Sequence, residues 1–152
     1  MSLGGWSITQ ELLDAMLQEV PTGTLLELGS GFGTGVLSEH YQVYSVEHDE
    51  KWTGVFDTNY IFAPIVRSWY DISILSRELP ESYDLILVDG PTGAIGRRGF
   101  ADNLNLFRDD VPIFFDDLER PAEMSLALEV SQKLGGGLIV SKLGEKSFGV
   151  VK

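Results

Sequence analysis

Apolar residues follow two alternating patterns along this chain. Segments with apolar positions three or four residues apart, as on one face of a helix, alternate with short continuous apolar runs that are typical of buried strands. The clearest strand is YDLILVD (83–89), whose unbroken apolar run is expected of a parallel strand covered on both faces. The clearest helix begins at Ser7, which forms a capping box with Gln10. The pattern predicts an α/β protein.

Seven strands are expected, and helices separate the first five. The predicted strands are 24–28, 43–46, 65–66, 83–89, 112–115, 137–143 and 146–152. The predicted helices are 7–20, 34–40, 50–56, 72–79, 101–107 and 120–134. Right-handed crossovers turn such alternation into a Rossmann-like, doubly wound, mostly parallel sheet with helices on both faces. The last two strands are joined by a short turn around Gly144, so the last strand is expected to be antiparallel.

The length of 152 residues is that of one domain. No apolar run approaches the roughly 20 residues that a membrane-spanning helix requires, so no membrane partner is expected. Residues 1–5 carry neither a charged segment nor an apolar segment of a signal peptide, and are expected to be disordered or derived from an expression tag. The sequence therefore predicts a single globular domain.

The chain is strongly acidic, with a formal net charge of -12. Such a charge repels nucleic acid and anionic lipid, which makes a small molecule the expected partner. Cysteine is absent, which excludes disulfides and thiolate metal sites within this sequence and favours a reducing, cytoplasmic location.

The stretch LLELGSGFGTG (25–35) places four glycines on alternate positions directly after the first strand. Glycine permits positive φ and exposes backbone N–H groups at a helix N-terminus, where nucleotide-like ligands bind. The dinucleotide fingerprint Gly-x-Gly-x-x-Gly fails in both registers, because Thr34 and Val36 stand where the third glycine is needed. A P-loop is also absent from the sequence.

The same stretch resembles the first motif of class I S-adenosylmethionine-dependent methyltransferases, Glu/Asp-x-Gly-x-Gly-x-Gly. An acid at the strand end suits a ligand that carries an ammonium and a sulfonium, whereas it would repel a pyrophosphate. The resemblance implies S-adenosylmethionine as the cofactor. The residues that it implies for cofactor binding are Glu27, Gly29, Ser30, Gly31 and Gly33.

Three further residues are candidates for the cofactor site. Glu47 ends the second strand, where the resemblance implies hydrogen bonds to the ribose hydroxyls, although an NAD enzyme would also have an acid here and a solvated loop acid is the alternative. His48 is expected near the adenine rather than as a catalytic base. Trp69 could stack on the adenine, or be a core or surface tryptophan.

Three carboxylates are expected beside the cofactor's sulfur, because Asp89 ends the fourth strand and Asp116 and Asp117 end the fifth. Such crowding is costly without a cation. The arrangement resembles the divalent-metal site of catechol-type O-methyltransferases, which implies Mg²⁺ or another divalent metal that lowers the pKa of an acceptor hydroxyl. The alternative is that Asp89 serves methyl transfer without metal and that Asp117 caps the next helix.

A narrower resemblance links three stretches to the glucuronoxylan 4-O-methyltransferases: VEHDEKW, YDLILVDGPTGAIGRRGF and FFDDLERPAE. Asp116 stands where that family has histidine. The resemblance implies O-methylation of a small hydroxylated, sugar-like acceptor. The Asn/Asp-Pro-Pro-Tyr signature of amine methylation is replaced by Asp-Gly-Pro-Thr, which disfavours a nucleic-acid base as acceptor.

On this reading Arg97 and Arg98 clamp an acceptor carboxylate, with Arg120 as a second candidate and surface solvation as the alternative. The general base is expected to be Asp89 with metal activation, and Lys142 is the second choice. The leading hypothesis is an S-adenosylmethionine-dependent methyltransferase. The alternatives are a binding-only scaffold or regulatory domain and an NAD-linked enzyme. A second copy of the chain, in a homodimer, could supply a lid over the site.

Overall fold

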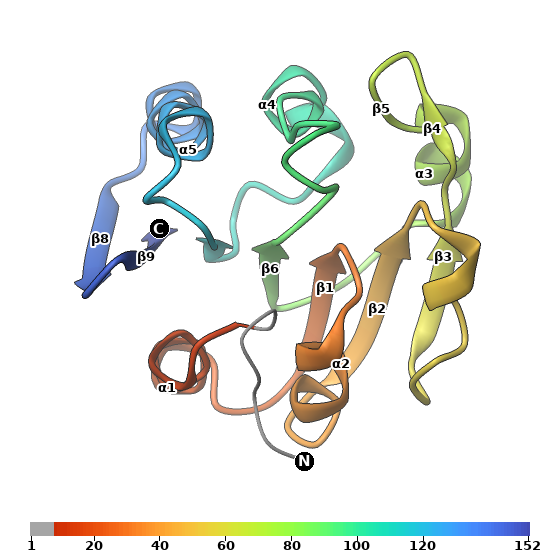
Figure 1. Cartoon of the computed structure of the whole chain (residues 1–152), viewed down its shortest axis with the longest axis horizontal. Coiled ribbons are helices and arrows are strands. Elements are labelled where there is room, and N and C mark those ends of the chain that lie inside the picture. Colours follow the sequence, from red (N-terminus) through yellow and green to blue (C-terminus); the bar gives the residue numbers. More distant parts are fainter. Residues whose placement is uncertain (1–7) are drawn as a thin grey trace.

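The computed structural model describes residues 8–152, which form a seven-stranded sheet in the order β3-β2-β1-β6-β7-β9-β8 (Figure 1). Strand β9 is antiparallel to both β7 and β8, and the other neighbours in the sheet are parallel. The predicted α/β, doubly wound architecture with an antiparallel last strand is confirmed. The strands are β1 (Thr24–Leu28), β2 (Gln42–Glu47), β3 (Asn59–Phe62), β6 (Leu85–Val88), β7 (Ile113–Phe115), β8 (Leu138–Leu143) and β9 (Lys146–Val151).

Helices cover both faces of the sheet, and each face has its own apolar cluster. Leu25 of β1 packs with the first cluster, on the side of α1 and α2, whereas the neighbouring Leu26 packs with the second, on the side of α3, α4 and α5. This alternation explains why the central strands read as continuous apolar runs. The helices are α1 (Gln10–Glu19), α2 (Phe32–Leu37), α3 (Ile72–Glu78), α4 (Gly99–Asp102) and α5 (Pro121–Leu134).

The predicted strand 65–66 is confirmed as a strand, but it is not the third strand of the main sheet. The sheet takes β3, Asn59–Phe62, whereas Ile65–Val66 (β4) pairs with Trp69–Tyr70 (β5) in a separate two-stranded hairpin. Arg67 and Ser68 join these two strands with φ angles of 55° and 78°, the left-handed pair that a tight hairpin turn requires. Strand β3 lies at the edge of the sheet and buries only Ile61, so it lacks the apolar run of a central strand.

Several predicted helix limits also differ from the observed ones. The expected helix 50–56 is only a short 3-10 turn, η1 (Glu50–Trp52), and Gly54 follows it in left-handed conformation with φ 80°. The expected helix 101–107 is divided into α4 and a second 3-10 turn, η2 (Leu104–Leu106). Helix α2 begins at Phe32 and ends at Leu37, earlier than expected at both ends.

The first described helix, α1, is capped by Thr9, whose Oγ1 accepts a hydrogen bond from the Leu12 N–H at 3.2 Å. The predicted cap at Ser7 and the expectation for residues 1–5 lie outside the described residues. Within residues 8–152, no helix combines the length and the apolar character that crossing a membrane demands.

Candidate functional site

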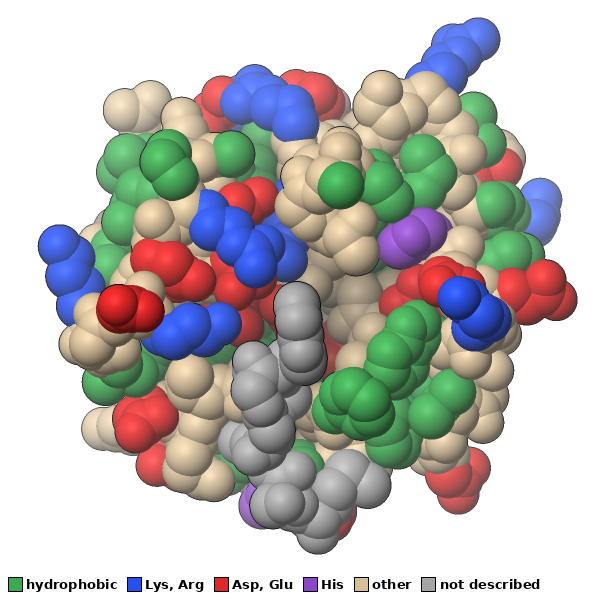
Figure 2. All heavy atoms as spheres, in the orientation of Figure 1, with side chains coloured by type: hydrophobic (Ala, Val, Ile, Leu, Met, Phe, Trp, Pro, Cys, Tyr) green, Lys and Arg blue, Asp and Glu red, His purple; other side chains and the backbone are tan. Residues whose placement is uncertain are grey.

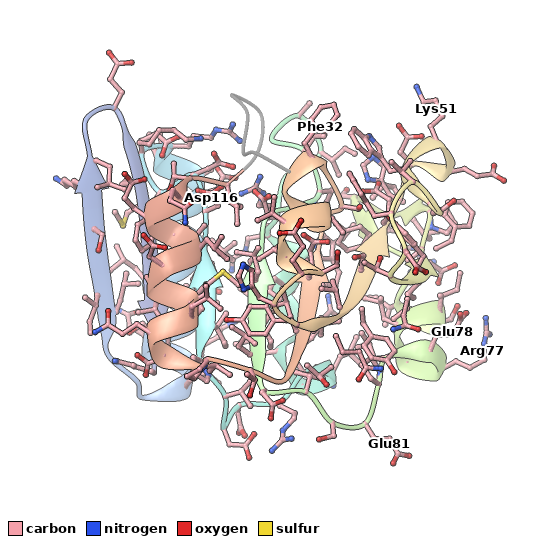
Figure 3. The ribbon with its side chains drawn as sticks, turned by 90° about the horizontal axis from the view of Figure 1, so that it is seen from below. Phe32, Lys51, Arg77, Glu78, Glu81 and Asp116 are labelled. Carbon is pink, nitrogen blue, oxygen red and sulfur yellow. The ribbon has the colours of Figure 1, made fainter. Side chains whose placement is uncertain are left out.

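A cavity of about 710 Å³ lies at the carboxyl ends of β1, β2, β6 and β7. This volume is typical of ligand sites, and this edge of an α/β sheet is where ligands bind. Figure 2 shows basic and acidic side chains gathered beside a hollow on this face, and Figure 3 shows Phe32 and Asp116 toward the same edge of the sheet, opposite Glu81. We call the lining residues 29–32, 47–49 and 52 the glycine half. We call the lining residues 89–93, 97, 116, 117, 120 and 146 the charged half.

Two glycines of the loop after β1 are needed for different reasons. Gly29 has φ 95°, and a Cβ there would lie 2.8 Å from the Cα of Gly90, so the close approach of two strand-end loops excludes a side chain. Gly31 has φ -165°, which any residue adopts, and a Cβ there would meet no atom of the described residues, 8–152, within 4 Å. Packing among the described residues therefore does not require glycine at position 31. The missing side chain leaves open space in which a ligand can lie against the backbone.

Glu27 supports this loop from beneath. Its Oε1 accepts hydrogen bonds from Thr34 Oγ1 and Ser45 Oγ, both at 2.8 Å, and Thr34 Oγ1 in turn accepts the Gly31 N–H at 3.0 Å. Burial raises the pKa of Glu27 to about 7 against the effect of these hydrogen bonds. Glu27 is buried and does not line the cavity, so the structure places it as a support of the loop rather than as a ligand contact.

Glu47 lines the cavity at the end of β2. Its Oε1 accepts the Ser30 N–H at 2.9 Å and its Oε2 accepts the Asp49 N–H at 2.7 Å, so two backbone groups fix the carboxylate. A carboxylate has about four lone-pair positions, so both oxygens can accept further hydrogen bonds from a ligand. His48 also lines the cavity, with Nδ1 3.3 Å from Glu47 Oε2.

An aromatic pair that sequence reasoning missed forms the rim of the glycine half. Phe32 is 55% exposed, and its ring makes an edge-on contact with Trp52 at a centroid distance of 5.2 Å. The candidate Trp69 instead lies buried in the core against Tyr70 and Phe107 and does not line the cavity. Trp52 follows Glu47 by only five residues in the same connection, and this proximity was the available signal.

The structure brings the three predicted carboxylates together. One oxygen of each of Asp89, Asp116 and Asp117 lies within 4.8 Å of the others. Burial, followed by the nearby Asp116 carboxylate, raises the pKa of Asp89 well above its ordinary value, although Arg97 opposes the shift. Burial, followed by the charge of Asp117, raises the pKa of Asp116 to about 6.

The two neighbouring arginines lie in different environments. The Arg97 side chain is 4% exposed, and its Nη2 lies 2.9 Å from Asp117 Oδ2 and 3.8 Å from Asp89 Oδ1. The Arg98 side chain is 58% exposed, pairs with Glu129, and does not line the cavity. Both arginines were predicted to clamp an acceptor carboxylate, with surface solvation as the alternative. Only Arg97 lies in the cavity, and there it is already paired with Asp117 and Asp89.

Two further cations complete the charged half. Arg120, the second candidate clamp, lines the cavity with Nη1 3.5 Å from Asp117 Oδ2. Lys146, which sequence reasoning missed, has Nζ 3.3 Å from Asp117 Oδ1. It begins β9, which returns antiparallel along β7, so only the long-range strand pairing brings it here. Lys142, the second choice of general base, is exposed on β8 and does not line the cavity.

The charged half does not fit a divalent metal. Magnesium needs carboxylate oxygens that are free to enter its coordination shell. Both oxygens of Asp117 face protein cations, and the Arg97 guanidinium contacts Asp117 and Asp89 together. Burial acts to raise the pKa of Asp117, but the charge and hydrogen bond of Arg97, followed by the two more exposed cations, bring it below its ordinary value. Asp117 does not cap α5 either, because the N-cap of that helix is Arg120.

Comparison with known proteins finds relatives by structure alone. No family model matches the chain, and no curated protein matches it. Among solved structures, precorrin 8W decarboxylase of Methanobacterium thermoautotrophicum has a TM-score of 0.65 and 12% identity over 95% of this chain and 90% of that one. Fibrillarin of Aeropyrum pernix, with natively bound S-adenosyl-L-methionine, has a TM-score of 0.60 and 14% identity over 86% of this chain and 66% of that one.

A third similar structure is the 16S rRNA methyltransferase RsmC of T. thermophilus, in complex with AdoMet and guanosine. It has a TM-score of 0.61 and 18% identity over 99% of this chain, which spans 44% of that protein. At these identities the likeness concerns the fold. The chain therefore has a Rossmann-like fold, which it shares with fibrillarin and with the methyltransferase RsmC.

Proposed function

We propose that this protein is an S-adenosylmethionine-dependent methyltransferase. The observation that carries the proposal is the pairing of two features in the glycine half: the open backbone at Gly31 and the Glu47 carboxylate fixed by two N–H groups. They lie at the carboxyl ends of β1 and β2, in a fold that fibrillarin and RsmC share. The acids Glu47 and Asp49 on this side suit a cationic ligand. The NAD-linked alternative is disfavoured by Thr34 and Val36, which stand where the dinucleotide fingerprint needs its third glycine.

In this function the glycine half holds the cofactor. The backbone around Gly31 would hold it at close range, and Glu47 would accept hydrogen bonds from the ribose hydroxyls. His48 and Trp52 line the same half of the cavity. When bound, S-adenosylmethionine supplies a methyl group that an acceptor oxygen attacks in line, so that a C–O bond forms as the C–S bond breaks and the sulfur leaves as a neutral thioether. Alignment and exclusion of water supply most of the catalysis in such a displacement.

Asp89 is the proposed catalytic acceptor of the hydroxyl proton. It follows β6 directly and lines the charged half of the cavity, with its side chain 25% exposed beside a second carboxylate. Its raised pKa makes it a stronger proton acceptor near neutral pH. No step in this proposal depends on a metal.

The proposed acceptor is a small hydroxylated, sugar-like molecule. What supports it is the resemblance of three stretches to sugar-modifying O-methyltransferases, together with the volume of about 710 Å³ that cofactor and acceptor must share. The net charge of -12 argues against a nucleic-acid acceptor, and the cysteine-free sequence favours a cytoplasmic setting. A second copy of the chain is our proposal for a lid over the site.

The test follows transfer of a radiolabelled methyl group to a panel of hydroxylated sugars and sugar acids, with cofactor binding measured in parallel. Asp89→Asn is expected to lower kcat by about 100-fold or more while cofactor affinity changes little. The exposed Asp109→Asn is the matched control, expected to behave as wild type. Cofactor binding without transfer to any acceptor would favour the binding-only alternative, and tight NADH binding without S-adenosylmethionine binding would overturn the proposal.

A further inference from the structure

The Arg97 guanidinium joins the two loops that form the charged half. Its Nε donates to the Pro91 carbonyl at 3.0 Å, and its Nη2 donates to the Asp89 carbonyl at 3.2 Å, both in the connection after β6. The same Nη2 donates to Asp117 Oδ2 at 2.9 Å, and Nη1 reaches the Asp116 carbonyl at 3.5 Å, both after β7. The five donors of a guanidinium suit such a bridge, whereas a single ammonium would make fewer of these bonds.

The charged half contains cations of the same chain as well as acids. Arg97, Arg120 and Lys146 line it together with Asp89, Asp116 and Asp117. All three cations lie within 4.0 Å of the Asp117 carboxylate. A dense acid cluster calls for a compensating cation, and here side chains of the same chain provide it.

The backbone at Asp117 is shaped to make these contacts. Its φ is 61°, a left-handed conformation that is costly for residues other than glycine and persists where the surroundings hold it. The Asp117 N–H donates to Asp116 Oδ1 at 2.8 Å, which closes this turn. The carboxylate is thereby held against Arg97, although the predicted metal site would need it directed at an external ion.

We infer that Arg97 occupies the role that a divalent metal would have in this acid cluster, and acts as a positioning residue that holds Asp89 and Asp116 at the cavity wall. The charged half is a metal-independent ion-pair network. The inference concerns the site of the proposed function, but metal binding is measured on the protein without methyl donor or acceptor. Its failure and the failure of the methyltransferase proposal are therefore distinguishable.

In the experiment, metal-free protein is titrated with Mn²⁺, and the concentration of free Mn²⁺ is measured by electron paramagnetic resonance. Wild type is expected to show only weak binding, roughly millimolar or weaker and unchanged by Asp117→Asn, because the acid cluster is already neutralised. Arg97→Met removes the resident cation and is expected to bind Mn²⁺ at least about tenfold more tightly than wild type, a difference of ~1.4 kcal/mol. Asp117→Asn added to Arg97→Met should abolish that gain.

Arg97→Lys is the second variant, since it retains the charge and buries no unpaired carboxylate. It is expected to fold, to exclude Mn²⁺ as wild type does, and to hold the two loops less firmly because an ammonium lacks the planar fork. Micromolar Mn²⁺ binding by wild type that Asp117→Asn removes would overturn the inference, whatever the fate of Arg97→Met. A folded Arg97→Met protein without any gain in Mn²⁺ affinity would overturn it as well.

Discussion

The two halves of the cavity are built in opposite ways. The glycine half comes from two short stretches, residues 29–32 and the connection that begins at Glu47, and its polar contacts are largely made to backbone N–H groups. The charged half gathers side chains from the ends of β6 and β7, from the loop that carries Arg97, and from the start of β9. One half is therefore a local backbone structure, whereas the other exists only when distant segments of the chain have met.

The largest effect is expected from valine substitutions of Gly31 and Gly29, which compare a glycine that leaves room for a ligand with one that the packing of the protein requires. Gly31→Val should fold, since a Cβ there meets no atom of residues 8–152 within 4 Å, but should abolish cofactor binding by filling the cavity. We expect a loss of about 1000-fold or more, which is ~4 kcal/mol. Gly29→Val is the contrast, because its side chain would collide with Gly90 and disturb the fold itself. Thermal unfolding and calorimetric cofactor titration of both variants check this, and a Gly31→Val protein that still binds would refute the assignment.

The next effect compares the adjacent arginines by urea denaturation. Arg97→Met leaves the buried Asp117 without its closest cation and is expected to lower the free energy of unfolding by about 3–5 kcal/mol. Arg98→Met removes an exposed pair with Glu129, which solvent screens, and is expected to change the free energy of unfolding far less than Arg97→Met does. An equal loss of unfolding free energy in the two variants would contradict the distinction between a buried ion pair at Arg97 and an exposed one at Arg98.

A smaller effect concerns Glu27 and the pH dependence of stability. Its pKa is raised from 4.5 to about 7 in the folded state, so the folded protein holds this proton more strongly than the unfolded chain. The stabilisation is present below pH 4.5 and is lost as the pH rises toward 7, by up to ~3 kcal/mol at about 1.4 kcal/mol per pKa unit. Glu27→Gln should remove this part of the slope.

The measurement for Glu27 is the free energy of unfolding of wild type and Glu27→Gln at several pH values between 4.5 and 7. The difference between the two proteins isolates Glu27 from Asp89 and Asp116, whose raised pKa values act in the same direction. Parallel curves for the two proteins would contradict the assignment of a buried, protonatable support beneath the loop.

The smallest effect distinguishes two tryptophans. Trp52 lies on the rim of the glycine half and Trp69 lies in the core, so cofactor binding should change the fluorescence of Trp52 and leave that of Trp69 unchanged. Trp52→Phe is expected to lose most of the fluorescence change and only about threefold in affinity, ~0.7 kcal/mol. Trp69→Phe should retain the change, and a signal that survives in Trp52→Phe but not in Trp69→Phe would reverse the assignment.

The same contrast explains what the sequence predicts well. The acid cluster was predictable from the strand ends, because parallel neighbouring strands bring Asp89 and Asp116 to one edge of the sheet. The glycine loop was predictable because its residues are consecutive in the sequence. The edge strand β3 escaped prediction, since one buried residue leaves little apolar pattern. The burial of Arg97 and the position of Lys146 beside Asp117 were not predicted either, because both depend on tertiary contacts between distant segments.

The proposed function requires that the open backbone beside Glu47 binds a sulfonium nucleoside. Isothermal titration of S-adenosylmethionine and its demethylated product into wild type and Gly31→Val measures this binding. We expect one saturable site in wild type, in the roughly micromolar range, and none in the variant. Wild-type protein that shows no saturation with either compound at about 1 mM, a binding free energy weaker than ~4 kcal/mol, would contradict it.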